Sequence, residues 1–299
     1  MNKILIILFF LVLPFADGYA EEASVPLTPS LSQSYQTDLM TGAAVVNVPI
    51  TVPPGRKGIQ PAIALRYSSS NPNGICGVGW SLELGAIQRN TKRGVPRYDS
   101  SDSFTANVGG AAMELVSIGS GEYRAKQEGA FMKFSFNGTS WQVRDQTGSV
   151  YLFGTSPDSR QADNGYIFKW GLDKVTDIHG NYMSLSYVHD GNEVYPEQIL
   201  YTGKEPGPAP IHSVNFIYEN RNDVLSSYRS AFEVSTAKRL STIDISTQGD
   251  RVRKYVIQYI YSAQTSRSLL SAVTTYGRDG ASSLPPVTFE YQSGSVIGE

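Results

Sequence analysis

The chain has only one cysteine, Cys76, so it cannot form an intramolecular disulfide, and packing and hydrogen bonds must stabilise it. Cys76 lies in an apolar, glycine-containing run, residues 75–78, with no adjacent cation. A reactive thiol needs a cationic or helix-terminal environment. We therefore predict that Cys76 is a small buried side chain.

An excess of charge of one sign is also lacking. The 299 residues include 25 Lys and Arg against 27 Asp and Glu, which gives a net charge of −2. Proteins that bind nucleic acids or anionic membranes usually carry a cationic excess. The composition therefore predicts no nucleic-acid partner.

Only one long apolar run is present, at residues 4–13, between Lys3 and the small residues Gly18 and Ala20 that precede Glu21. This layout is typical of a secretory signal peptide, whereas a spanning helix needs about 20 apolar residues. We expect a signal peptide at 1–20, no membrane span after its cleavage, and a secreted, extracellular protein that is periplasmic in transit. The alternative is a retained membrane anchor.

The remaining chain divides by composition. Residues 21–33 are polar with Pro and Ser and predict a flexible leader, and residues 34–299 predict one β-rich domain. The loop 203–210 contains three prolines, which cannot donate hydrogen bonds in a central strand ladder. This loop is a candidate sub-boundary within the domain.

Sets of catalytic or metal-binding residues are absent as sequence motifs. The three histidines, His179, His189 and His212, lack zinc-site spacing and two of them lie in turn sequences. No Gly-x-Ser-x-Gly elbow exists, and the glycines of residues 74–79 precede no βαβ unit. We predict no metal, no cofactor and no catalytic residue.

Acidic side chains leave one enzymatic interpretation open, because the carboxylate pair of a glycoside hydrolase is defined only in space. Its candidates are Asp99, Asp102, Asp173 and Asp177. The Asp- and Asn-rich turns could also form a weak calcium site, but they do not match an EF-hand loop. Hydrogen-bonded Asx turns are the favoured interpretation.

Short alternating apolar runs between turn residues indicate an all-β fold of antiparallel strands and hairpin meanders that form a large curved sheet or shell segment. The clearest example is residues 131–153, where Asn137-Gly138 suits a tight hairpin turn and predicts a three-stranded meander. The only hint of a helix is at residues 223–230.

A triplet of an apolar residue, any residue and tyrosine recurs along the chain. Its copies are Leu65-Arg66-Tyr67, Leu185-Ser186-Tyr187, Phe216-Ile217-Tyr218, Ile257-Gln258-Tyr259 and Phe289-Glu290-Tyr291. Residues i and i+2 of a strand share a face, so each triplet places its two large side chains together. The last four copies predict a loosely repeated strand–loop–strand unit. A sheet-packing ladder is favoured over a stripe that binds sugars.

Two blocks of the sequence resemble the SpvB and insecticidal toxin-complex B family, and parts of them resemble Rhs-type shell proteins. The matching segments are 41–43, 48–50, 53–56, 58–61, 65–69, 77–82, 87–89 and 94–99, then 175–177, 180–181, 187, 216–219, 221, 223, 239–240, 253–255, 268–270, 276–277 and 284–291. Their order and spacing resemble the family's amino-terminal domain over residues 34–291.

Seven residues of these blocks are expected to shape the fold: Gly77, Gly79, Trp80, Asp177, Gly180, Asn181 and Tyr187. The glycines before Trp80 let backbone pass closely while the ring fills the core. Asp177 to Asn181 predicts a tight turn in which Gly180 takes a positive φ.

The resemblance implies a non-catalytic structural or interaction module of a secreted toxin or virulence-factor system, similar to the wall that encloses or presents a toxic carboxy-terminal domain. It implies partners among toxin-complex or Rhs-like subunits, or missing downstream repeats if the product is truncated. The family's ADP-ribosyltransferase activity needs a Glu-x-Glu pair, and none is present. The alternative is an extracellular carbohydrate-binding β module.

Overall fold

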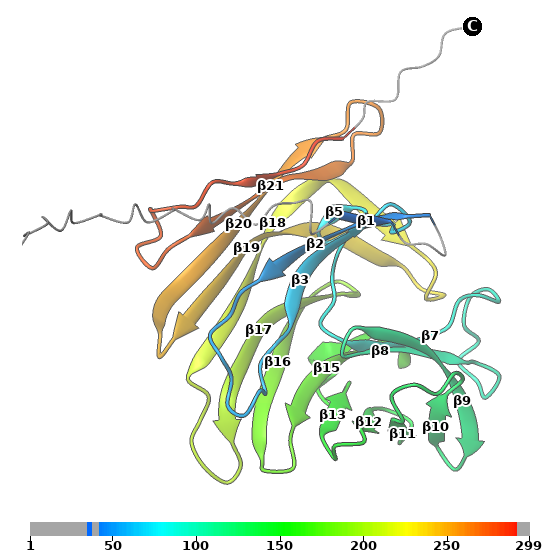
Figure 1. The fold of residues 1–299 in the computed structure, drawn as a ribbon. Helices are drawn as coiled ribbons and strands as arrows, with labels where there is room; N and C mark the ends of the chain where they lie inside the picture. The colour runs from blue at the N-terminus through cyan, green and yellow to red at the C-terminus, as the bar shows by residue number, and fades with distance from the viewer. Residues whose placement is uncertain (1–34, 38–41, 292–299) are drawn as a thin grey trace, which may run out of the picture.

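The computed structural model describes residues 35–37 and 42–291. The predicted signal peptide and most of the predicted leader therefore lie outside the described residues. Within the described ranges the only helix is the 3-10 turn η2 (Pro157–Ser159), and no helix is long and apolar enough to cross a membrane. The predicted all-β class is confirmed, with strands in a small sheet, a closed cylinder and a long curved sheet (Figure 1).

The small sheet has the strand order β1-β2-β3-β6. Its strands are β1 (Tyr35–Thr37), β2 (Ala44–Ile50), β3 (Ile63–Ser68) and β6 (Trp80–Leu82), and a separate ribbon pairs β4 (Asn73–Gly74) with β5 (Gly77–Val78). A hairpin that contains the turn residues Pro53 and Pro54 joins β2 to β3.

The cylinder closes because β15 pairs with both β7 and β13. Its strands are β7 (Ala86–Arg89), β8 (Phe104–Val108), β9 (Ala111–Gly119), β10 (Glu122–Ala125), β11 (Lys133–Phe136), β12 (Trp141–Arg144), β13 (Val150–Phe153) and β15 (Tyr166–Thr176), and β14 (Arg160–Asp163) pairs with the outer part of β15. Strands β11 to β13 form the predicted three-stranded meander, which is confirmed.

From β15 the sheet continues through seven antiparallel strands. They are β16 (Asn181–Asp190), β17 (Glu193–Lys204), β18 (His212–Ser227), β19 (Val234–Thr247), β20 (Asp250–Tyr261), β21 (Ser268–Tyr276) and β22 (Val287–Thr288). The loop 203–210 joins β17 and β18, which pair directly with each other. The helix hint at 223–230 is wrong, because residues 225–227 pair with β19.

Side-chain alternation explains where the core lies. Leu185, Ile199, Val214 and Ile243 are buried on one face of the curved sheet. The small sheet packs on this face, and the hydroxyl of Tyr201 donates to Pro53 O at 3.0 Å (Figure 1). The opposite face carries polar residues such as Ser186, Gln198, Asn215, Thr242 and Lys254.

Aromatic rings fill the cylinder. Trp141 stacks on Phe136 with ring centroids 4.4 Å apart, and Phe104 meets Trp141 edge to face at 4.9 Å. Trp170 of the shared strand β15 lies 5.5 Å from Phe136. Such contacts add stabilisation beyond area burial. The cylinder is therefore a packed core rather than a pore.

The tyrosine triplets mark a repeated unit. In four copies the hydroxyl donates to a backbone carbonyl of the preceding strand in the sheet, at 2.7–2.8 Å. The donor and acceptor pairs are Tyr187 and Leu172, Tyr218 and Pro196, Tyr259 and Leu240, and Tyr291 and Leu270.

Each acceptor lies beside a β-bulge. The register shifts leave Asp173, Glu197, Ser241 and Ser271, each directly after an acceptor, without a paired residue opposite. A bulge disrupts the ladder locally and leaves backbone groups in need of partners. The tyrosine hydroxyl of the next triplet supplies such a partner for the acceptor carbonyl. This contact is the physical basis of the repeat, and it favours the sheet-packing interpretation of the triplets.

Removing one of these hydroxyls should destabilise the fold. Tyr259→Phe deprives the buried carbonyl of Leu240 of this partner. We expect the free energy of unfolding in urea to fall by about 1–3 kcal/mol. Tyr166→Phe is the control, because Tyr166 is exposed and its hydroxyl has no hydrogen bond among the described residues; a change beyond about 0.5 kcal/mol is not expected there. Equal effects of the two variants would contradict the account.

Candidate functional site

One polar cluster in the core centres on Arg221 of β18. The Arg221 side chain is fully buried and forms a bidentate pair with Asp223, Nε to Oδ1 at 3.0 Å and Nη2 to Oδ2 at 2.6 Å. Its Nη1 donates to Gly74 O at 2.8 Å, and its Nη2 also donates to Asn73 Oδ1 at 2.9 Å. A buried guanidinium is tolerated only when its donors are satisfied in this way.

Asp223 completes this cluster by accepting from a third segment. Ser268 donates to it through its backbone N–H at 2.7 Å and its hydroxyl at 2.6 Å. Burial acts to raise the pKa of Asp223, but hydrogen bonds from Arg221, Ser268 and Asn73 outweigh it and hold that pKa well below its usual range. The cluster Asn73, Arg221, Asp223 and Ser268, here called the latch, joins the β4 ribbon, β18 and β21.

This depressed pKa predicts acid sensitivity. A carboxylate with a lowered folded-state pKa stabilises the fold above its unfolded-state pKa and loses that contribution as the pH falls. The free energy of unfolding should therefore decline below about pH 5. In urea unfolding at a series of pH values, Asp223→Asn should show a shallower decline than the unmodified chain. Asp250→Asn, at the exposed start of β20, should keep the full decline; a parallel slope for Asp223→Asn would refute the prediction.

Gly77 lies against the latch, and Gly79 and Trp80 follow it in the chain. A Cβ on Gly77 would meet Ser268 O at 2.8 Å, and one on Gly79 would overlap the ring of Tyr67. Trp80 is 2% exposed, its Nε1–H donates to the hydroxyl of Tyr291 at 2.9 Å, and its ring meets that of Phe289 at 4.7 Å. These residues connect the small sheet to the last part of the described chain.

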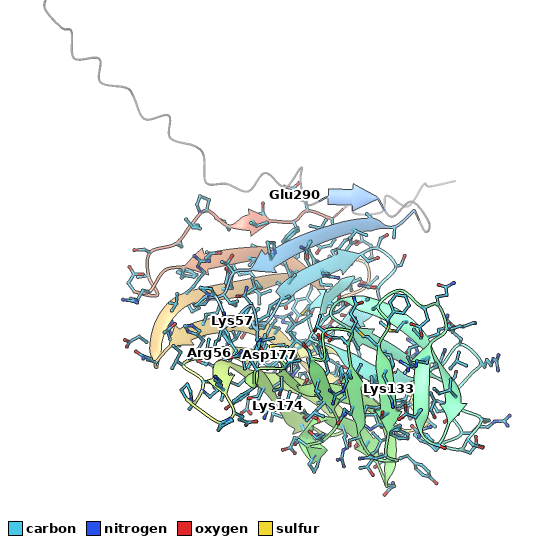
Figure 2. All side chains as sticks on the ribbon, turned by 60° about the horizontal axis from the view of Figure 1, so that its bottom comes forward. Arg56, Lys57, Lys133, Lys174, Asp177 and Glu290 are labelled. Atoms are coloured by element: carbon cyan, nitrogen blue, oxygen red, sulfur yellow. The ribbon has the colours of Figure 1, made fainter. Side chains whose placement is uncertain are left out.

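Asp177, Gly180 and Asn181 form the turn between β15 and β16. Asp177 accepts from the backbone N–H of Asn181 at 2.9 Å and from its side-chain amide at 2.7 Å. Gly180 has φ +79°, as predicted, and its backbone runs so close to Glu205 that a Cβ would overlap the Glu205 carbonyl. Figure 2 shows Asp177 and Lys174 near each other, and Lys174 pairs with Glu205 at 2.6 Å.

Tyr187 packs over Gly171, where a Cβ would lie 2.8 Å from the tyrosine ring. The seven predicted residues thus occupy turns and junctions in separate parts of the fold. The latch residues Arg221 and Asp223 fall within the family-like blocks, but no feature of the sequence shows that Asn73 and Ser268 meet them.

Cys76 is fully buried beside the latch, and burial raises the pKa of its thiol to about 12, although the nearby Arg221 acts in the opposite direction. The predicted burial of Cys76 is confirmed.

The other titratable candidates do not converge. His189 Nε2 bonds to Asp158 O and His212 Nδ1 to the hydroxyl of Thr247, both at 2.9 Å, whereas His179 lies exposed in the Asp177 turn. No group of three His, Cys, Asp or Glu side chains that could hold a metal ion exists among the described residues.

The four acidic candidates each serve a local structure. Asp102 pairs with Arg89 at 2.7 Å, and Asp99 accepts from Ser101 in an Asx turn. Asp173 is buried and accepts from Thr155, while its Oδ1 has no partner in the described structure. Asp177 is held in its turn as described above.

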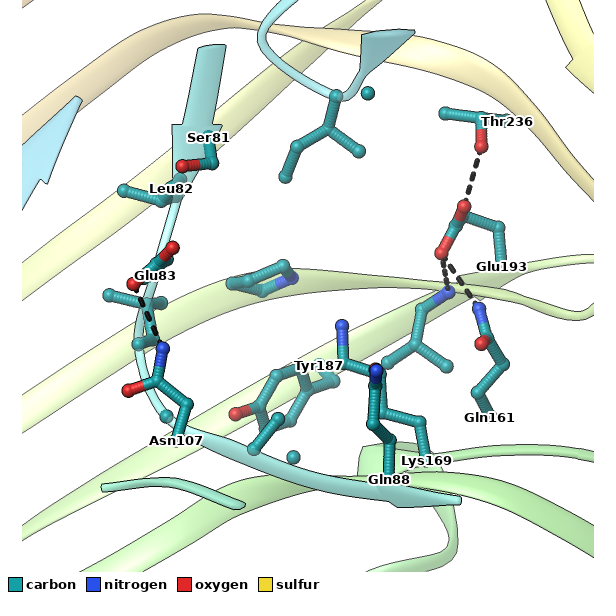
Figure 3. Close-up of a pocket in the computed structure, with 18 of the residues that line it drawn as sticks. Ser81, Leu82, Glu83, Gln88, Asn107, Gln161, Lys169, Tyr187, Glu193 and Thr236 are labelled. Atoms are coloured by element: carbon teal, nitrogen blue, oxygen red, sulfur yellow. Dashed lines mark hydrogen bonds between the residues drawn. The ribbon is translucent and has the colours of Figure 1, made fainter. Parts of the chain in front are cut away.

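One large cavity lies where the three substructures meet (Figure 3). Its volume is about 570 Å³, and its walls come from β6, from β7, β8 and β15 of the cylinder, and from β16, β17 and β19 of the curved sheet. Ser81, Glu83, Gln88, Lys169 and Glu193 give it a polar lining. Its residues are spread from position 71 to position 236, so no local sequence signal marks it.

Comparisons with known proteins identify relatives of part of this chain. Residues 38–137 match the family model for SpvB, described as Salmonella virulence plasmid 65kDa B protein. The mono(ADP-ribosyl)transferase SpvB of Salmonella enteritidis is 25% identical over a match that covers 56% of this chain and 33% of that protein, and the Salmonella choleraesuis protein is 26% identical, with coverages of 51% and 31%. The chain therefore spans about a third of the length of these relatives.

Solved structures show the same fold. The amino-terminal domain of the effector SpvB from Salmonella typhimurium strain LT2 aligns with a TM-score of 0.67 and 20% identity over 78% of this chain and 98% of that domain. The complex TcdB2-TccC3-TEV aligns with a TM-score of 0.74 and 19% identity over 95% of this chain and 17% of that one. The predicted resemblance is confirmed: residues 38–137 match the SpvB family model, and the chain has the fold of the SpvB amino-terminal domain and of a segment of the TcdB2-TccC3 complex.

Proposed function

We propose that the chain is a non-catalytic wall and interaction module of a secreted toxin or virulence system. The observation that carries this proposal is the alignment of 95% of the chain with a segment of a toxin complex. Gly77, Gly79, Trp80, Asp177, Gly180, Asn181 and Tyr187 then serve as structural residues that fix turns and sheet junctions.

The polar groups of the core support a structural role. All three guanidinium nitrogens of Arg221 donate to acceptors of the β4 ribbon or to Asp223. The hydroxyls of the triplet tyrosines donate hydrogen bonds to the backbone carbonyls beside the bulges. A catalytic site needs polar groups that are free to engage a substrate, often with perturbed pKa values in a shared cleft. The polar groups of the latch and the triplet tyrosines engage protein partners instead.

The partner class follows from this role. Subunits of a toxin complex, or Rhs-like shell repeats, would associate with the module, and its site of action would be extracellular after export by a signal peptide at 1–20. Sheet edges and exposed strands offer the means of association. No contact with nucleic acid is expected from the net charge of −2.

The proposal is tested by co-expressing the chain with toxin-complex or Rhs-like proteins encoded beside its gene. Size-exclusion chromatography with light scattering should give a complex whose mass equals the sum of the subunits. A chain that stays strictly monomeric under these conditions would contradict the proposed role as an interaction module. Hydrolysis of a glycan that is lost in Asp173→Asn or Asp177→Asn would favour the enzymatic interpretation instead.

A further inference from the structure

The cavity between the three substructures has the position and size of a ligand site. Pockets of about 300–1,000 Å³ at the junction of structural units commonly bind small molecules. The lining residues Pro72, Glu83 and Ala112 are exposed, so the cavity of about 570 Å³ opens to solvent. Leu82 and Leu84 add an apolar wall on the side of the small sheet.

Two carboxylates are fixed on opposite sides of the cavity. Glu193 accepts from Gln161 Nε2 at 3.0 Å and from the hydroxyl of Thr236 at 2.6 Å, and Glu83 accepts from Asn107 Nδ2 at 2.8 Å (Figure 3). Neither carboxylate pairs with a cation among the described residues. Ionised carboxylates have lone pairs left for further donors, and here they are held in place before any ligand arrives.

The same cavity is lined by a cation that has no partner among the described residues. Lys169 is half-buried, and within the described part of the chain its ammonium has neither an ion pair nor a hydrogen bond. Its neighbours across the strands are Gln88 on β7 and Gln161 on β14. The amide of Gln88 also has no hydrogen-bond partner among the residues described, and Figure 3 shows the two side chains next to each other.

We propose that this cavity binds a saccharide with a single carboxylate, of the uronic acid class. The carboxylate pairs with Lys169 and accepts from the Gln88 amide, and ring hydroxyls donate to Glu193 and Glu83. The apolar wall of Leu82 and Leu84 faces the C–H groups of the sugar ring. This site is separate from the triplet tyrosines, and it is independent of the proposed wall function.

The charges of the cavity restrict the ligand. A neutral sugar leaves the Lys169 ammonium without a counter-charge, and a charge-assisted hydrogen bond is about twice as strong as a neutral one. A phosphorylated ligand would place close to two negative charges near Glu83 and Glu193, which is unfavourable for like charges. A ligand with one carboxylate and several hydroxyls therefore matches a cavity lined by one lysine and two glutamates.

The test is calorimetric titration of the whole chain with disaccharides that contain one glucuronic, galacturonic or mannuronic acid residue, each beside its neutral counterpart. At least one acidic disaccharide should bind about tenfold or more tightly than its neutral counterpart. Lys169→Met should remove this preference, and Lys169→Arg should retain most of it. Lys174→Met is the matched control, because Lys174 lies outside the cavity and pairs with Glu205.

The proposal is overturned if none of the acidic disaccharides binds, or if Lys169→Met binds as the unmodified chain does. Stronger binding of a short Glu-containing peptide than of every saccharide would assign the cavity to a protein segment and would also overturn it. Circular dichroism of each variant establishes that it is folded. Because association with a shell subunit is measured separately, either proposal can fail while the other stands.

Discussion

Arg221→Met is expected to lower the free energy of unfolding by about 3–5 kcal/mol, because it leaves the Asp223 carboxylate buried without its cation. The Asp223 side chain is only 7% exposed, so water cannot replace the guanidinium. The carbonyl of Gly74 and the side chain of Asn73 lose their donor at the same time. Urea unfolding monitored by tryptophan fluorescence measures the change.

Two further variants separate charge from packing. Arg97→Met at an exposed position should change the free energy of unfolding by no more than about 0.5 kcal/mol. Adding Asp223→Asn to Arg221→Met removes the uncompensated charge and should recover part of the loss. A loss below about 1 kcal/mol for Arg221→Met, or no recovery in the double variant, would show that the latch is not a main stabilising contact.

Trp80→Ala should cost about 3–5 kcal/mol, the range for removing a buried tryptophan. Trp80 packs between Tyr67 and Phe289. Its Nε1–H donates to the hydroxyl of Tyr291, which in turn donates to the carbonyl of Leu270 beside the last bulge. The variant should therefore release the segment around Phe289. Limited proteolysis should cut this segment faster in Trp80→Ala than in the unmodified chain.

Trp80→Phe is the matched control for that experiment, because it retains an aromatic ring and loses the N–H donor. We expect a smaller loss of about 1–2 kcal/mol. If Trp80→Ala left both the unfolding curve and the proteolysis rate unchanged, the ring would not join the small sheet to the end of the described chain.

Local patterns in the sequence were sufficient to predict part of this fold. The alternating residues around Asn137-Gly138 predicted the meander β11 to β13, because a hairpin depends on neighbouring residues. The shared face of Ile257 and Tyr259 was also predictable. The bulges were not, because a bulge is a property of two paired strands.

Long-range contacts explain what was missed. Asp223 begins the segment 223–230 that gave the hint of a helix, yet it accepts hydrogen bonds from Ser268, 45 residues away. Lys169 and Gln88 share a cavity only because β15 pairs with β7. Neither pairing has a local signature.

The tyrosine units also suggest how the curved sheet is extended. Each pair of strands contributes a bulge and a tyrosine that closes it, so the sheet resembles a repeat array in which a unit contacts mainly its neighbours. Such an array suits a wall, because it lengthens without a new core.

The most direct measurement is a cryo-electron microscopy structure of the chain bound to the toxin-complex or Rhs-like subunit encoded beside its gene. The account predicts that the chain forms part of a continuous β wall, with its core latch and tyrosine-closed bulges unchanged. A chain that lies outside the wall, or one that presents a converging set of carboxylates to a bound substrate, would contradict it.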